Sequence, residues 1–139
     1  MGPAHQRDEV LEASAALSAA IDERDWAGLR SLMVPEVRAY GARGVDAVIC
    51  VMQAHLGGVG ATQHLLGNHR VTMGAESANV LSYGRIHHVG AGPMSGQSYE
   101  CMGEYTDTWV RTAEGWLLAR RWFEIKIEVG QRAVLRPAG

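Results

Sequence analysis

The sequence predicts an α+β fold, a cone-shaped α+β barrel in which N-terminal helices pack on a strongly curved, mostly antiparallel sheet. Two observations predict it: apolar residues recur at helical spacing in the first part of the chain, and four long strand candidates follow in the second part. Because twist accumulates along strands of this length, we expect the sheet to curl. A curled sheet closed off by helices leaves a conical interior, the kind of concave site that binds small molecules.

Helices are expected in three places. In residues 6–24 the apolar positions step by three and four, and Asp22 falls at the edge of the buried stripe. A short second helix is capped by Asp25 and ended by Pro35. The third helix has Asp46 in its first turn, where a negative charge suits the helix dipole, and it ends at a glycine pair.

Strands are predicted where the spacing of apolar residues changes from three or four positions to two. A short strand at 37–40 precedes a turn at 41–44, and long strands are expected at 62–73, 78–88, 98–112 and 116–129. The glycine-rich joint 89–97 is expected to be a loop. Residues 1–139 are expected to form a single domain, with loose termini at 1–5 and 131–139.

Composition excludes several classes of function. The 139 residues are 47% hydrophobic and 20% charged, and the formal net charge of −2 provides no electrostatic footprint for nucleic acid or an anionic membrane. The sequence has no charged-then-apolar leader and no apolar run of roughly 18 residues, so a cytoplasmic location is expected. Cys50 and Cys101 are expected to be small buried thiols in a reducing compartment.

The stretch at 61–71, ATQHLLGNHRV, is the most informative part of the sequence. Counted by twos along a strand, His64 and Asn68 point to one face and His69 to the other. A sheltered face seldom carries an imidazole and an amide unless they have partners or a task. We therefore interpret His64 as the working histidine. The histidines expected to be structural or solvent-facing are His5, His55 and His69.

Three segments carry a resemblance to a known family. They are IDERDWAGL at 21–29, ATQHLLGNHR at 61–70 and GEYTDTWVRTAEGW at 103–116. In this order and spacing they resemble the SnoaL-like branch of the nuclear transport factor 2-like superfamily, in particular scytalone dehydratase and hexachlorocyclohexane dehydrochlorinase. The resemblance covers most of the chain and implies a cofactor-independent enzyme that often pairs through the outer face of its sheet.

The resemblance also implies a set of catalytic residues. Asp22 matches the aspartate that pairs with the family's histidine base, and His64 matches that histidine. His88, or alternatively His87, matches a second histidine on the next strand. Tyr40 falls near a tyrosine that helps to polarise a carbonyl through a water, although a core or binding role is the alternative.

The candidate substrate-binding residues are Asn68, Glu104, Thr106, Trp122 and Trp26. Glu104 and Thr106 match a serine and an asparagine of scytalone dehydratase. All of these candidates except Thr106 have an alternative role. Glu104 is equally compatible with a charge in solvent, and Asn68 with a hydrogen bond to the backbone. The tryptophans are equally compatible with the hydrophobic core. Ile21 stands where that enzyme has its other tyrosine, which argues against scytalone as the substrate. The positive residues Arg120, Arg121 and Lys126 are expected on a wet or dimer-facing edge.

These residue types fit proton abstraction next to a carbonyl. If one nitrogen of His64 donates to Asp22, the other accepts a proton, and the carboxylate steadies the imidazolium. His88 would then protonate a departing oxygen, and Tyr40 would hold the developing enolate. The expected function is therefore a dehydratase or cyclase acting on a small cyclic or polyketide-like carbonyl compound.

Two alternatives remain open at this point. A double-bond isomerase would use the same base, and a non-catalytic binding or dimerisation module would use the same cone. No metal is expected, because no close ligand pair such as a His-Glu helix motif occurs. The expected partners are a small-molecule substrate and further copies of the chain in a dimer or trimer.

Overall fold

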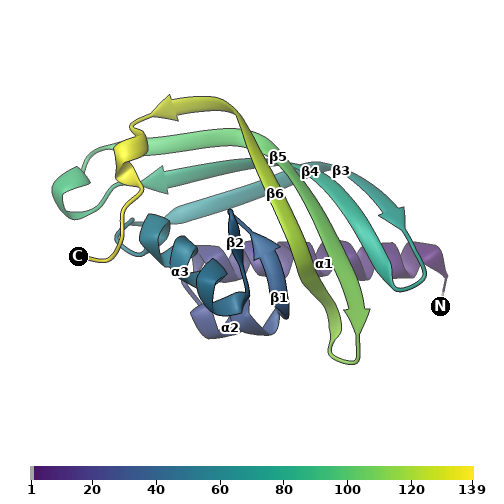
Figure 1. Cartoon of the computed structure of the whole chain (residues 1–139). Helices are drawn as coiled ribbons and strands as arrows, with labels where there is room; N and C mark the ends of the chain where they lie inside the picture. The colour runs from purple at the N-terminus through teal and green to yellow at the C-terminus, as the bar shows by residue number, and fades with distance from the viewer. Residues whose placement is uncertain (1) are drawn as a thin grey trace.

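The computed structural model describes residues 2–139 and consists of three helices packed on an open, six-stranded mixed sheet. The helices are α1 (Pro3–Asp22), α2 (Trp26–Ser31) and α3 (Val45–Leu56). The strands are β1 (Met33–Ala39), β2 (Ala42–Arg43), β3 (Thr62–Met73), β4 (Ser77–Val89), β5 (Ser98–Thr112) and β6 (Gly115–Gly130). Figure 1 shows the sheet arching over the helices, with the two termini at opposite ends.

The sheet order is β2-β1-β6-β5-β4-β3, and β1 pairs in parallel with β6 while the other neighbours are antiparallel. The strongly curved, mostly antiparallel sheet predicted from the sequence is therefore confirmed. The four long strands lie within one residue of their predicted bounds. A short 3₁₀ helix, Gly92–Met94, lies in the predicted loop between β4 and β5.

The first two helices differ from their predicted bounds. The expected loose segment 1–5 is helical from Pro3, and Met1 lies outside the described residues. Asp25 caps α2 as predicted, its side chain accepting a hydrogen bond of 2.9 Å from the Gly28 amide. Pro35 does not end this helix but lies in β1, where the register with β6 is interrupted and a missing N–H is tolerated.

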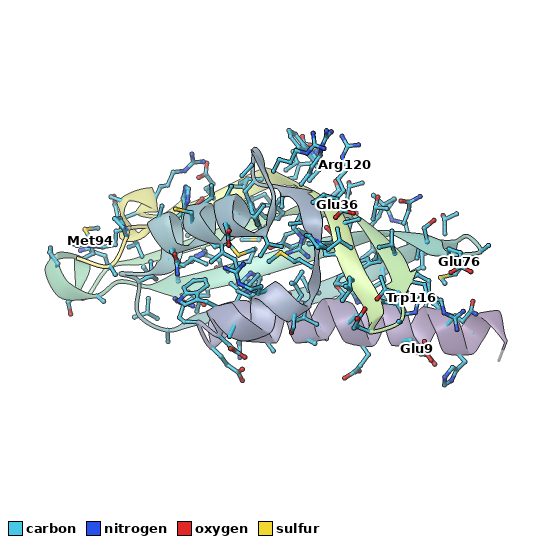
Figure 2. All side chains as sticks on the ribbon, turned by 60° about the horizontal axis from the view of Figure 1, so that its bottom comes forward. Glu9, Glu36, Glu76, Met94, Trp116 and Arg120 are labelled. Carbon is cyan, nitrogen blue, oxygen red and sulfur yellow. The ribbon has the colours of Figure 1, made fainter. Side chains whose placement is uncertain are left out.

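The core lies between α1, α3 and the concave face of the sheet. Its largest buried side chains include Leu17 of α1, Val48 of α3, Trp109 of β5 and Leu118 of β6. Figure 2 shows Trp116 reaching α1, where its indole N–H donates to a Glu9 carboxylate oxygen at 3.3 Å. These contacts fix α1 across the sheet and leave its last turn beside the start of β3.

The C-terminal segment 131–139 also departs from expectation, because it packs on the molecule. Its 3₁₀ helix, Arg132–Val134, buries Val134 completely against a second apolar cluster that includes Tyr99 and Tyr105. Cys101 belongs to the same cluster, whereas the expectation of a buried thiol is wrong for Cys50, which is exposed on α3. No helix formed by residues 2–139 is long and apolar enough to cross a membrane.

A β-bulge in β3 changes which residues face the core. The register between β3 and β4 shifts between Gly67 and Arg70, and Asn68 adopts a left-handed conformation with φ 50°. The bulge inserts one residue into the alternation, so His69 turns inward and Asn68 becomes exposed. The prediction that Asn68 shares a face with His64 is therefore wrong.

Candidate active site

Asp22 and His64 meet where the last turn of α1 crosses the start of β3. The His64 ring nitrogen Nδ1 lies 2.7 Å from Asp22 Oδ1, and the His64 backbone N–H donates to Asp22 Oδ2 at 2.9 Å. Because a carboxylate only accepts, the proton of the neutral imidazole lies on Nδ1. The other nitrogen, Nε2, then carries the free lone pair.

The environment keeps Asp22 charged. Burial alone would raise the pKa of this carboxyl group, but the hydrogen bonds from the His64 side chain and backbone outweigh it, so the pKa is lowered. Thr62 contributes a further hydrogen bond of 2.8 Å from its hydroxyl to Asp22 Oδ1. The site thus pairs an ionised carboxylate with an imidazole oriented by two contacts.

His64 lies on the wall of a cavity of about 310 Å³ between α3 and the concave face of the sheet. Most of the wall is apolar, with Ile21, Met52, Ile86 and Phe123 among its residues. Its polar side chains come from different elements and are His64, His88, Tyr40, His55, Tyr99 and Tyr105. A mostly apolar pocket with a few convergent polar groups is typical of small-molecule sites.

His88 is the member of the pair His87–His88 that faces this cavity. It is buried while His87 is exposed, and its Nδ1 donates to the Tyr99 carbonyl oxygen at 2.9 Å. Burial lowers the pKa of His88, and the positive charge of Arg24 acts in the same direction. His88 is therefore a neutral ring with a free Nε2 lone pair near pH 7.

Tyr40 lies in the turn between β1 and β2, held in a left-handed conformation with φ 53°. Its hydroxyl oxygen accepts a hydrogen bond of 3.3 Å from Arg121 Nη1, which leaves the hydroxyl proton free to be donated. Arg121 is 3% exposed and pairs with both carboxylate oxygens of Asp107, at 2.9 and 2.8 Å.

The expectation that Arg121 lies on a wet or dimer-facing edge is wrong. A register shift between Thr108 and Trp109 displaces β6 relative to β5, so Arg121 points inward and Arg120 is exposed. Figure 2 labels Arg120 at the outer margin of the molecule. The buried guanidinium also stacks on the Tyr105 ring, 4.1 Å from its centroid.

The comparisons with known proteins identify the family. The SnoaL-like domain matches residues 3–122. The chain belongs to the SnoaL-like family. No curated protein matches this SnoaL-like protein.

Solved structures with the same fold span nearly the whole SnoaL-like chain. A Kribbella flavida protein is 20% identical with a TM-score of 0.81, covering 96% of this chain and 98% of that one. A candidate scytalone dehydratase from Novosphingobium aromaticivorans is 19% identical with a TM-score of 0.77, covering 94% and 91%. The hexachlorocyclohexane dehydrochlorinase LinA-type3 from Novosphingobium barchaimii is 14% identical with a TM-score of 0.76, covering 90% and 89%. The fold is that of the nuclear transport factor 2-like superfamily.

The candidate substrate-binding residues of this SnoaL-like protein lie outside the cavity lining. Glu104 and Thr106 alternate with Tyr105 and Asp107 along β5, so they point to the convex face of the sheet. Trp122, opposite Thr106 on β6, is 64% exposed on that face. Of the remaining two, Asn68 lies at the β3 bulge, and Trp26 lies in a groove beside the end of α3.

Tyr105 and Arg121 are the main features of the site that the sequence reasoning missed. Burial raises the pKa of Tyr105 well above its usual value, so its phenol stays protonated. The signal that would have found Tyr105 is the alternation Tyr99, Cys101, Tyr105, Asp107 on one face of the predicted strand. Arg121 had no such signal, because the register shift between Thr108 and Trp109 breaks the alternation along β6 before Arg121.

A second, more polar groove of about 340 Å³ lies behind His64, between α1 and β3. Asp22, His64 and His69 line it, and His69 Nδ1 lies 2.7 Å from the Ser82 hydroxyl. Asp22 belongs to this groove and not to the lining of the main cavity. The imidazole of His64 thus separates the two spaces. Within residues 2–139, no group of three or more His, Cys, Asp or Glu side chains converges as a metal site.

Proposed function

We propose that this SnoaL-like protein is a cofactor-independent lyase of the dehydratase or cyclase kind, acting on a small cyclic or polyketide-like carbonyl compound. The observation that carries the proposal is the 2.7 Å contact between His64 Nδ1 and Asp22 Oδ1 at the wall of an apolar cavity. This contact leaves His64 Nε2 as a base whose protonated form is stabilised by a carboxylate.

The proposed reaction begins at His64 Nε2. It takes a proton from the carbon next to the substrate carbonyl, and the electron pair of the C–H bond moves into an enolate. The enolate expels the hydroxyl group on the β-carbon, which leaves as water with the proton that His64 took. General acid–base help of this kind contributes about 10²–10⁴-fold to the rate.

Tyr40 and His88 have supporting roles in the proposal. The Tyr40 hydroxyl, which accepts from Arg121, donates its proton in a hydrogen bond to the developing enolate oxygen. The sequence reasoning assigned His88 as the acid for the departing oxygen. Because His88 is a neutral ring whose Nδ1 is bound to the Tyr99 carbonyl, we assign it instead as an acceptor that orients the substrate hydroxyl.

Turnover of a panel of cyclic β-hydroxy ketones tests the proposal, with water loss followed by mass and by the absorbance of the conjugated product. For a substrate that the unmodified protein dehydrates, His64→Gln and Asp22→Asn lower kcat/KM by about 10²–10⁴-fold with an unchanged circular dichroism spectrum. His87→Gln is the matched control, because His87 is exposed beside the site. Full activity of His64→Gln would refute the role of His64 as the base.

The same experiment separates the alternative functions. An isomerase would incorporate deuterium from heavy water into the panel compounds without losing mass as water. A binding module would bind them, as measured by calorimetry, without either change. The proposal also includes self-association through the convex face of the sheet, where Leu65, Tyr83, Trp122 and Ile127 are exposed.

A further inference from the structure

Arg24 occupies a backbone position that normally belongs to glycine. It follows the end of α1 with φ 56°, its N–H bonds to the Ile21 carbonyl at 3.0 Å, and the Asp25 N–H bonds to the Ala20 carbonyl at 2.9 Å. This pair of hydrogen bonds is a Schellman motif with Arg24 at its left-handed position. A residue with a Cβ costs roughly 1 kcal/mol there relative to glycine, so the side chain calls for an explanation.

The Arg24 guanidinium binds the ends of two helices and the approach to β3. It donates to the Ile21 carbonyl at the end of α1 at 3.0 Å, to the Leu56 carbonyl at the end of α3 at 3.1 Å, and to the Gly60 carbonyl at 2.9 Å. Carbonyl groups at helix C-termini lack helical partners and carry partial negative charge, which suits a cation. Arg24 thereby holds the segments that carry Asp22 and His64 in one arrangement.

A chain of hydrogen bonds continues from Arg24 into the dyad. Arg24 Nη1 donates to the Thr62 hydroxyl oxygen at 2.8 Å, and that hydroxyl donates to Asp22 Oδ1 at 2.8 Å. The same carboxylate oxygen accepts from His64 Nδ1 at 2.7 Å. Because Arg24 can only donate, it fixes the direction of the Thr62 hydroxyl, and Thr62 can then only donate to Asp22.

We propose that Arg24 and Thr62 are positioning residues for the Asp22–His64 dyad: Arg24 fixes Thr62, and Thr62 fixes the carboxylate that orients the imidazole. The inference deepens the proposed function, since it names the groups that hold the base. It also accounts for an arginine at a strained position. The titratable groups that face the Asp22 carboxylate are His64 on β3, Arg24 after α1 and His69 on the wall of the same groove.

Nuclear magnetic resonance of the labelled protein tests the inference without a substrate. The unmodified protein shows a downfield Nδ1–H resonance from His64, as expected for a hydrogen bond to a carboxylate. Thr62→Val, which keeps the side-chain shape, and Arg24→Gly, which relieves the backbone strain, both lose or broaden this resonance. In both variants the pKa of Asp22, measured by carbon-13 titration, rises. Thr62→Val removes a donor to the carboxylate, and Arg24→Gly removes a positive charge that interacts with it and the group that holds the Thr62 hydroxyl.

Thr72→Val is the matched control, because Thr72 is exposed on the same strand away from the dyad. This control keeps the resonance and the Asp22 titration of the unmodified protein. If folded Thr62→Val and Arg24→Gly keep the resonance and the Asp22 titration unchanged, the inference is overturned and the proposed function is not affected. Absence of the resonance from the unmodified protein would contradict the Asp22–His64 hydrogen bond, on which the proposed function depends. Neither comparison depends on a measurement of activity.

Discussion

Asp107 and Arg121 form a buried ion pair beneath the tyrosines of the cavity. Their side chains are almost inaccessible to solvent, and each carboxylate oxygen accepts from the guanidinium. Taking two charges out of water is costly, and such a pair is favourable only with good geometry and further partners. Here the further partners are the Tyr40 hydroxyl and the Tyr105 ring. The ion pair therefore connects the stability of the core to the shape of the cavity.

His88 predicts a pH dependence of stability at the residue scale. Its pKa in the folded protein is lowered by burial from the ordinary value of 6.5, so the unfolded chain binds more protons in acid. Stability is unaffected by His88 above pH 6.5 and falls as the pH drops from 6.5 toward the folded-state pKa. The slope for one proton is at most about 1.4 kcal/mol per pH unit.

Urea unfolding at pH 7 and pH 5.5 measures this dependence. His88→Gln, which retains a donor for the Tyr99 carbonyl, loses less stability on acidification than the unmodified protein. His87→Gln, an exposed neighbour, behaves like the unmodified protein. An equal loss of stability in His88→Gln and the unmodified protein would contradict the buried, neutral state of His88.

The contact between Asp22 and His64 was expected from the family resemblance, and the two residues keep their expected positions because both lie in regular stretches. Asp22 follows an uninterrupted helical pattern, and His64 precedes the bulge of its strand. The catalytic use of the pair stays a prediction. Arg24 could not be predicted, because its role depends on a left-handed turn and on carbonyl groups from elements far apart in sequence.

At the scale of elements, the bulge in β3 decides which side chains reach α1. Asn68 at φ 50° suits the bulge, since asparagine tolerates the left-handed region better than most residues. Asn68→Val therefore lowers the free energy of unfolding by about 1–2 kcal/mol, whereas Asn68→Gly does not. Urea denaturation measures both, with Arg70→Val, exposed in the extended part of the same strand, as the control. Similar losses in Asn68→Val and Arg70→Val would contradict a bulge-specific strain.

The bounds of the long strands and of α3 could be predicted because glycine-rich or polar turns separate these elements in the sequence. The predicted sheet faces were wrong for residues that follow an irregularity in their strand. Asn68 follows the bulge after Gly67, and Arg121 follows the register shift at Thr108. A period of two carries no information about where one residue is inserted, because the insertion is fixed by pairing with a neighbouring strand. Glu104 and Thr106 were matched to the family by position, which does not define the face of a strand, and the alternation along β5 places both on the convex face.

At the scale of the whole molecule, the convex face of the sheet exposes an apolar surface. Leu65, Tyr83 and Ile127 surround a groove of about 710 Å³ that also contains Arg85 and Lys126. Contiguous apolar surface of this kind marks an interaction site. Light scattering is therefore expected to show a homo-oligomer at micromolar concentration, and Ile127→Glu is expected to shift it to monomers.

Ala16→Glu is the matched control for this prediction, because Ala16 is exposed on α1, away from the convex face. It leaves the oligomer intact. A monomeric unmodified protein would contradict self-association through the sheet without bearing on the dyad, which lies on the opposite face.

The imidazole of His64 lies between two spaces that have different environments. Its ring borders the apolar cavity, while the carboxylate that holds it borders a polar groove open to water. A molecule that fills the cavity therefore does not cover the groove through which solvent reaches the Asp22 carboxylate. Solvent therefore reaches the Asp22 carboxylate, which is 20% exposed, more readily than the imidazole of His64, which is 6% exposed.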